Sequence, residues 1–208
     1  MPPPPQVRVR RPPLSDYETI WREMREWCDS AAENAPDEIW LLQHPPIYTL
    51  GQAGRAAHLL RDNGIPLVRT DRGGQITYHG PGQIVAYMLI HLRRRGWGAR
   101  RLADKMQNAV VALLREYGIA ARTDASAPGV YVRDAKIAAL GLRIRRGKSY
   151  HGLALNVDMD LSPFADINPC GFAGLRTAQI ADFSPRPLAE VREDLARHLL
   201  RELAEAAE

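Results

Sequence analysis

Residues 72–83 read Arg-Gly-Gly-Gln-Ile-Thr-Tyr-His-Gly-Pro-Gly-Gln, and the chain on either side is arranged to hold them. Four glycines and a proline in twelve residues predict a loop and not a regular helix or core strand, because glycine costs backbone entropy and proline removes a donor. Glycine also lets a ligand approach the main chain closely, while Thr77, Tyr78 and His79 add a hydroxyl, a ring and an imidazole. A surface turn is the plain alternative, but this density of glycine with polar side chains favours a binding loop.

The segments around this loop have the pattern of strands. We expect residues 67–70 to form a short strand that leads into the glycine-rich loop. The nearly continuous apolar run 84–92 predicts a strand that is buried on both faces. A second glycine-bearing stretch, residues 51–55, lies where it can face the first. The binding loop is therefore expected to sit on a rigid support.

Apolar periodicity predicts the remaining elements. Ser15 and Glu18 form a capping box that starts a helix ending before Ala35, with Cys28 on its buried stripe. Further helices are expected at 100–117 and 188–206. Strands are expected at 38–42, 47–50 and 130–132, and residues 136–144 and 149–157 should form a hairpin that turns at Arg146-Gly147.

Composition is that of an ordinary globular protein. Of the 208 residues, 45% are hydrophobic and 25% are charged, which is enough for one domain with a real core. No apolar run approaches the roughly 20 residues that span a bilayer, and the amino terminus lacks the apolar region of a signal peptide. We expect a cytoplasmic protein with a flexible proline-rich arm at 1–13 and one catalytic domain at 14–208.

The formal net charge of +4 favours an acidic partner without naming it. Arg93, Arg94 and Arg95 form one basic cluster, and a second contains Arg143, Arg145 and Arg146. The partner could be nucleic acid or an acidic protein. Neither cluster is interleaved with the aromatic residues on which single-strand binders stack bases, and a solvated face is the simple explanation. Only three of the 28 basic residues are lysines, which draws attention to Lys105, Lys136 and Lys148, because an amine can lose its proton and a guanidinium cannot.

Cys170 is the candidate nucleophile. It stands in a loop sequence, Asn-Pro-Cys-Gly, which differs from the apolar helical stripe that contains Cys28. A thiol of ordinary pKa, ~8.5, is mostly protonated at neutral pH and needs a nearby cation or base. Lys136 at the start of an apolar strand is one choice, and His79 and His151 are the others. The sequence contains no nucleophile elbow, phosphate-binding loop, dinucleotide fingerprint or zinc motif.

Four blocks of this chain together resemble the bacterial octanoyltransferase family. They are residues 72–83, the stretch Lys-Ile-Ala-Ala-Leu-Gly-Leu-Arg at 136–143, Ser-Tyr-His-Gly-Leu-Ala-Leu-Asn-Val-Asp at 149–158, and Ile-Asn-Pro-Cys-Gly at 167–171. They occur in order between about Ile47 and Leu175. One departure is Met88 after Tyr87, where many members have proline, and it touches no proposed catalytic residue.

The resemblance implies a fold and a site. The fold is a single α/β (α+β) domain similar to the biotin and lipoate protein ligase catalytic core, with a mixed sheet flanked by helices. The catalytic pair falls on Cys170 and Lys136. The acyl-binding segments fall on Arg72, Gly73, Gly74, Gln75, Ile76, Thr77, Tyr78 and His79, on Ala139, Leu140 and Gly141, and on Gly152, Leu153 and Ala154.

The resemblance also implies a reaction and its partners. Octanoyl-acyl carrier protein would donate an octanoyl group to Cys170, and the acceptor lysine of a lipoyl domain, in 2-oxoacid dehydrogenases or the glycine cleavage H protein, would receive it. No cofactor, metal, nucleic acid or membrane is expected. The two alternatives are an ATP-dependent lipoate- or biotin-type ligase and a non-catalytic module that binds lipoyl domains or nucleic acid.

Overall fold

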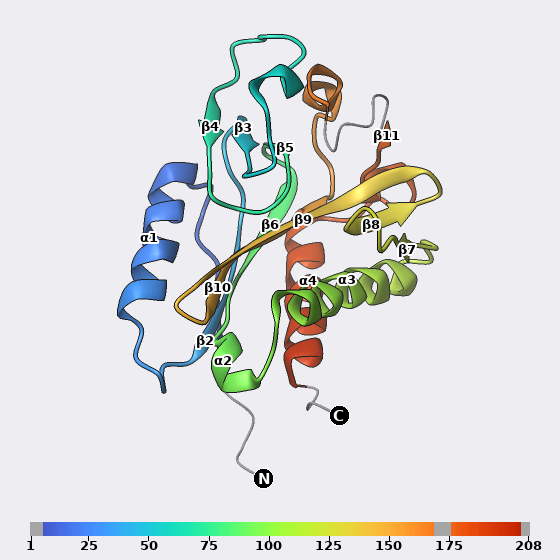
Figure 1. Ribbon diagram of the computed structural model, residues 1–208. Helices are drawn as coiled ribbons and strands as arrows, with labels where there is room; N and C mark the ends of the chain where they lie inside the picture. The colour runs from blue at the N-terminus through green and yellow to red at the C-terminus, as the bar shows by residue number, and fades with distance from the viewer. Residues whose placement is uncertain (1–5, 169–175, 205–208) are drawn as a thin grey trace.

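The computed structural model describes residues 6–168 and 176–204. A mixed sheet crosses the molecule in the order β1-β2-β6-β10-β9-β8-β7, with β11 beside β9 (Figure 1). Its strands are β1 (Val7–Arg10), β2 (Asp37–Leu42), β6 (Gln83–Leu89), β7 (Arg122–Thr123), β8 (Gly129–Val132), β9 (Ala135–Arg145), β10 (Lys148–Asn156) and β11 (Arg176–Thr177).

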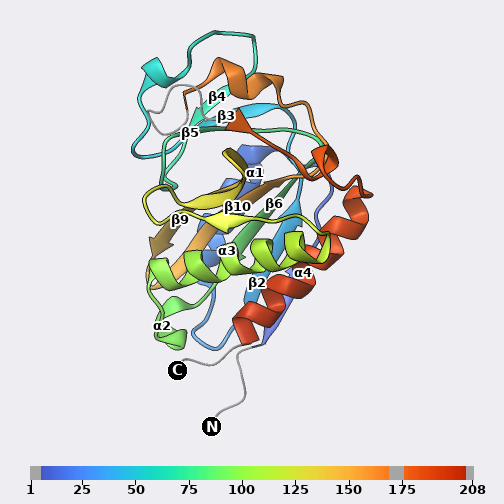
Figure 2. The same ribbon diagram turned by 90° about the vertical axis from the view of Figure 1, so that its right-hand side faces the viewer.

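Two long helices cover one face of this sheet. Helices α3 (Ala99–Glu116) and α4 (Leu188–Ala204) cross in front of it in Figure 2, and the short α2 (Leu92–Arg95) precedes α3. The main core lies under them. It joins alternate residues of β6 and β10, such as Ile84, Ala86 and Leu153, to the apolar stripes of both helices.

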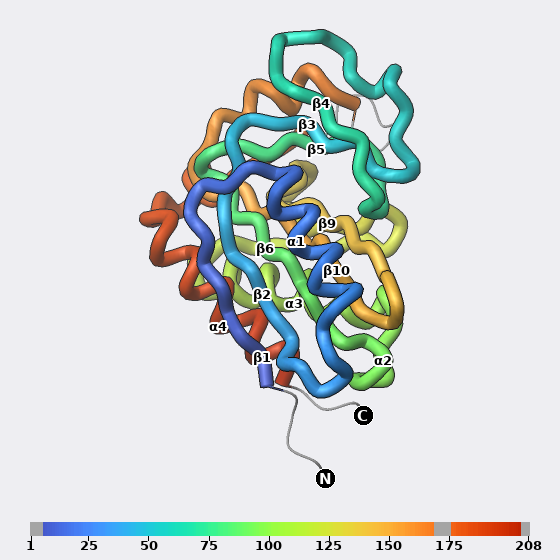
Figure 3. Tube along the Cα trace, turned by 90° about the vertical axis from the view of Figure 1, so that its left-hand side faces the viewer, coloured from blue at the N-terminus to red at the C-terminus, as the bar shows by residue number. Residues whose placement is uncertain are grey.

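Helix α1 (Tyr17–Ser30) covers the opposite face, as Figure 3 shows. Its buried residues Ile20, Met24 and Cys28 pack with the other alternate set of β6 and β10, including Val85 and Ala154. The Lys148 ammonium donates to the carbonyl oxygens of Cys28 and Ala31, at 3.1 and 2.6 Å. A cation there satisfies the last carbonyls of α1 and complements the helix dipole.

A smaller sheet stands above the first, in the order β4-β3-β5. Its strands are β3 (Ile47–Leu50), β4 (Leu67–Arg69) and β5 (Ile76–His79), and the 3₁₀ helices are η1 (Ala56–His58), η2 (Ser162–Asp166) and η4 (Ile180–Asp182). The two glycine-bearing loops do face each other: Gly51, Gln52 and Ala53 donate backbone hydrogen bonds to Gln75, Arg72 and Gly74.

The structure confirms most of the expected elements, including the β9–β10 hairpin and its turn at 146–147, and corrects three expectations. Val7–Arg10, within the segment expected to be a flexible arm, pairs with β2 in parallel. Ile76–His79, expected to be loop, forms β5 on β3, because the residues between the glycine pairs alternate as a strand does. The cap of α1 is Asp16, which accepts from the Thr19 amide, while the Ser15 hydroxyl donates to Pro13.

Candidate active site

A cavity of about 740 Å³ lies between the two sheets. Its floor comes from β6, β9 and β10, its roof from the loop before β5 and from β5 itself, and its rim from the start of α3 and residues 123–128. The cavity brings together segments separated by more than a hundred residues in the chain. We therefore take it as the candidate active site.

The cavity collects nearly all of the predicted site residues that the structure describes. Lys136 lines it together with Arg72, Gly73, Gly74, Gln75, Ile76, Thr77, His79, Ala139, Leu140, Gly141, Gly152, Leu153 and Ala154. Tyr78 is the exception, because its ring packs against Tyr48 and Phe164 in the smaller core. Tyr78 thus supports the roof and does not line the cavity.

Arg72 gives the glycine loop its shape. The guanidinium donates to the carbonyl oxygens of Thr49, Gln75 and Gly73 at 2.6, 2.8 and 2.9 Å, and to the Thr49 hydroxyl. Arg72 is buried, and its planar fork of donors ties β3 to the loop. The glycines therefore form a fixed wall of the cavity.

Small residues form the floor of the cavity. Gly141, Ala139, Gly152 and Ala154 stand opposite one another on β9 and β10. Gly73 crosses above Gly141. A Cβ on Gly141 would lie 2.8 Å from the Gly73 carbonyl oxygen, which is closer than real Cβ atoms come to other atoms. An alanine at 141 would therefore push the roof away from the floor, and the absence of a side chain there keeps the slot narrow.

Lys136 occupies one end of this slot. Its Nζ lies 3.5 Å from the Pro128 oxygen and 5.3 Å from the centre of the Tyr131 ring. Thr177 pairs with Lys136 in parallel, and the Ala178 amide donates to the Lys136 carbonyl. Cys170 lies outside the described residues, so its predicted proximity to Lys136 stays a prediction.

Sequence reasoning missed the carboxylate of Asp71. Asp71 accepts from Trp21 Nε1 at 2.9 Å, from His151 Nε2 at 3.0 Å and from the Tyr150 hydroxyl. Burial alone would raise the pKa of Asp71, but the hydrogen bonds from His151 and Tyr150 hold that pKa well below its usual range. This contact fixes His151, whose φ is +60°, in the cavity wall. Nothing in the sequence around Asp71, which directly precedes Arg-Gly-Gly, indicated this role.

His44 and His79 are buried and neutral beside the cavity. His44 Nδ1 donates to the Ser15 carbonyl at 2.7 Å and Nε2 accepts from the Tyr87 hydroxyl at 2.8 Å, while His79 Nδ1 donates to Gln83 Oε1 at 2.8 Å. Burial is the main reason that the pKa of His44 falls to about 4 and that of His79 to about 3. These two imidazoles therefore add no positive charge to the site at neutral pH.

These two histidines make stability fall as the solution is acidified. In the unfolded chain both take up protons below about pH 6.5, whereas the folded protein does not until about pH 4. Stability is thus present above pH 6.5 and is lost toward pH 4. The two histidines together should lower the free energy of unfolding, measured by urea denaturation, by about 4 kcal/mol between pH 7 and pH 5. His151 and His91, whose pKa values are also lowered by burial, add to this decrease.

His44→Gln is the matched variant for this prediction. Glutamine keeps an acceptor for the Tyr87 hydroxyl but does not titrate, so the decrease between pH 7 and pH 5 should be about 2 kcal/mol smaller. A variant whose stability depends on pH as strongly as the wild type would show that His44 is not the cause.

Cys28 is a structural thiol, as the sequence predicted. It is fully buried, and its Sγ lies 3.8 Å from the Ser149 oxygen. Burial raises the pKa of Cys28 to about 12, against the opposing effect of Lys148. Such a thiol is inert at neutral pH.

Residues 6–168 and 176–204 contain neither a candidate metal-binding cluster nor a helix that could cross a membrane. In that part of the chain no group of three or more His, Cys, Asp or Glu side chains is placed to hold a metal ion. Over the same ranges no helix has the length and apolar character that crossing a bilayer requires.

Comparison with known proteins places the chain in a family. Residues 16–201 match the family model described as the lipoyl protein ligase A/B catalytic domain. A protein of Aromatoleum aromaticum named octanoyltransferase is 58% identical over 96% of this chain and 85% of its own length. One of Dechloromonas aromatica with the same name is 56% identical over 94% of this chain and 96% of its own length.

Solved structures confirm the fold. Lipoate-protein ligase A bound with ATP superimposes with a TM-score of 0.79 at 20% identity, covering 99% of this chain and 87% of that one. Biotin protein ligase from Aquifex aeolicus gives 0.54 at 11% identity, covering 95% and 68%. With relatives of this identity over nearly its whole length, the chain belongs to the octanoyltransferases of the lipoyl protein ligase A/B catalytic domain family.

Proposed function

We propose that this protein transfers an octanoyl group from octanoyl-acyl carrier protein to the acceptor lysine of lipoyl domains, through a thioester on Cys170. The observation that carries the proposal is the cavity, in which Lys136 stands at one end of a narrow slot floored by Ala139, Gly141 and Ala154. Its relatives named octanoyltransferase support acyl transfer as the reaction class.

In the first half of the reaction, Lys136 lowers the pKa of the Cys170 thiol and takes its proton. The thiolate attacks the thioester carbon of the donor. The new carbon–sulfur bond forms as the old one breaks, and the carrier thiolate leaves with the electron pair and takes up the proton. The octanoyl chain then lies along the apolar walls at Ala139-Leu140 and Leu153-Ala154.

In the second half, the uncharged amine of the acceptor lysine attacks the Cys170 thioester. A carbon–nitrogen bond forms, the carbon–sulfur bond breaks, and the proton released from nitrogen returns to the sulfur through Lys136. Backbone amides of the glycine loop and of Gly171 are the candidate donors to the developing oxyanion. The product is an amide on the lysine side chain. The proposed acceptors are the lipoyl domains of 2-oxoacid dehydrogenases and the glycine cleavage H protein.

Intact mass spectrometry after incubation with octanoyl-acyl carrier protein tests this mechanism. The wild type should gain the mass of one octanoyl group, and Cys170→Ala should gain none. Cys28→Ala is the matched control and should acylate like the wild type, because the Cys28 thiol is buried and protonated.

Three results would contradict the proposal. Active wild-type protein with an unchanged mass would exclude a stable thioester intermediate. Activity that instead requires ATP and free octanoate would favour a ligase, which activates the acid as an adenylate and needs no nucleophilic cysteine. Binding of a lipoyl domain without any transfer would favour a binding module.

A further inference from the structure

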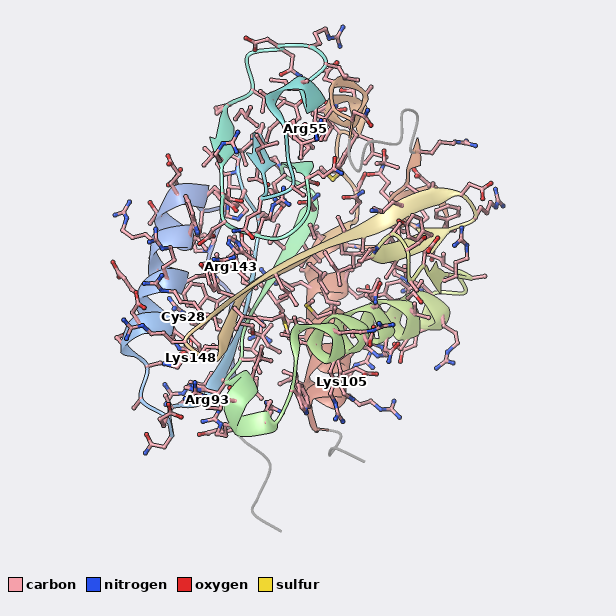
Figure 4. The ribbon with its side chains drawn as sticks, viewed as in Figure 1. Cys28, Arg55, Arg93, Lys105, Arg143 and Lys148 are labelled. Carbon is pink, nitrogen blue, oxygen red and sulfur yellow. The ribbon has the colours of Figure 1, made fainter. Side chains whose placement is uncertain are left out.

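Two basic clusters that are separate in the sequence meet at the β9–β10 turn. The Arg93 amide donates to the Gly147 carbonyl at 3.1 Å, and the Arg93 side chain packs 3.3 Å from the point where a Gly147 Cβ would lie. Arg145 and Arg146 flank the same turn. Figure 4 labels Arg93 and Arg143 on the side of the molecule where this hairpin ends.

The first cluster divides its charges between the interior and the surface. Arg94 and Arg95 turn inward to the buried carboxylate of Asp37, at 2.8 and 2.6 Å. Arg93 stays exposed. We call Arg93, Arg143, Arg145 and Arg146 the hairpin patch.

The hairpin patch keeps an excess of positive charge. Arg145 and Arg146 share one carboxylate, that of Asp29, at 2.8 and 3.2 Å, and among the described residues neither Arg93 nor Arg143 has an ion pair. Some exposed arginines elsewhere pair with carboxylates, as in Arg11–Glu193, Arg186–Glu190 and Arg197–Glu116. The hairpin patch is distinguished by its density, because it gathers four arginines around one turn with a single carboxylate paired to them.

Arg143 joins the hairpin patch to the rim of the cavity. The preceding residue, Leu142, lines the cavity, and its carbonyl accepts from the Gly73 amide at 2.9 Å. The Arg143 guanidinium donates at 3.0 Å to Oε1 of Gln52, which belongs to the glycine-bearing loop 51–55. An anionic molecule held on the patch would thus lie beside the entrance to the slot.

The distance along β9 between Arg143 and Lys136 indicates which of the two macromolecular substrates can dock at the hairpin patch. Arg143 is seven residues from Lys136, roughly 20 Å at the rise of a strand. A lysine side chain spans only about 6 Å from its backbone, by the bond lengths of a four-carbon stem. A protein that presents a lysine must therefore dock nearer to Lys136, whereas a thioester on a long prosthetic arm can start from the hairpin.

We propose that the hairpin patch is the docking surface for the acidic carrier protein that donates the acyl group, with the carrier's arm entering the slot past Arg143. The inference rests on the proposed function and names the contact surface for one of its partners. Arginine suits this role, because its fork binds carboxylates and the phosphate of the arm in two-point contacts. Charges at the edge of an interface act mainly on encounter rate and salt dependence.

The test is Arg93→Glu/Arg146→Glu, assayed for acylation by two donors. With octanoyl-acyl carrier protein at low salt, kcat/KM should fall by about tenfold or more because KM rises, while kcat changes little. With octanoyl-pantetheine, which has the arm without its phosphate and without the carrier, kcat/KM should stay within twofold. Raising the salt concentration should lower the wild-type rate with the carrier and narrow the difference between the two proteins.

Arg115→Glu/Arg201→Glu is the charge-matched control, because both residues are exposed on α3 and α4 and the net charge changes by the same amount. An equal loss in this control would make the effect one of net charge and overturn the proposal. So would unchanged kinetics of the hairpin variant with the carrier, equal losses with both donors, or a loss confined to transfer onto the lipoyl domain. Failure of the wild type to acylate would instead refute the proposed function itself.

Discussion

Lys136→Arg is expected to lower octanoyl transfer at least about 100-fold while leaving the reactivity of Cys170 toward alkylation at neutral pH close to that of the wild type. The guanidinium retains the positive charge that stabilises a thiolate, but it does not exchange its proton at these pH values. The substitution thus separates electrostatic activation of the sulfur from proton transfer. Steady-state transfer assays and the pH profile of alkylation measure the two effects.

Lys136→Met removes both effects, so alkylation of Cys170 should also shift to higher pH. Lys105→Arg is the control, because Lys105 pairs with Glu202 at 3.3 Å and an arginine can keep that pair. Transfer by Lys136→Arg within fivefold of the wild type would show that the site needs only a positive charge at this position.

Gly82→Ala is expected to destabilise the fold by more than about 4 kcal/mol. Gly82 has a φ of +86°, and a Cβ there would lie 1.9 Å from the Asp158 carbonyl oxygen. The backbone has little freedom to move away, because the Gly82 carbonyl accepts from the amides of Val157 and Asp158 and its own amide donates to Gln43. The turn also joins β5 to β6, so His79 and Gln83 should shift with it.

Gly96→Ala separates the conformational strain from the collision. Gly96 has a similar φ of +64° at the end of α2, but no atom lies within 4 Å of its Cβ position. Its cost should be about 1–2 kcal/mol, the strain of the left-handed region alone. Urea denaturation of both variants measures the difference, and equal losses would contradict the role given to Asp158.

Long periodic segments were predictable from the sequence because local pattern and tertiary packing agree there. The stripes of α3 and α4 and the alternation of β9 and β10 match the cores that they enter. Short elements were not predictable. The glycines around β5 predicted a loop, although its four residues alternate as a strand does. In β1, two valines alternate with arginines, and this segment forms a strand only because β2 offers its edge.

Much of the candidate site was predictable because its residues come in contiguous blocks. The glycine pattern pointed to 72–79 and the family resemblance to 139–141 and 152–154, and the cavity contains all of these residues except Tyr78. Asp71 and the pair His44–Tyr87 were missed because their importance lies in long-range hydrogen bonds. Linear sequence contains no trace of a bond that joins residue 71 to residue 151.

The parallel pairing of β1 with β2 bears on how this molecule avoids self-association. Without Val7–Arg10, the backbone groups of Asp37–Trp40 would form an open border of a broad apolar sheet, which invites strands of other molecules. β1 covers that border with a four-residue strand whose arginines are exposed, and Pro12 and Pro13, which follow Arg11, cannot donate to a further strand. The amino-terminal segment therefore protects the molecule from aggregation, at a distance from the chemistry.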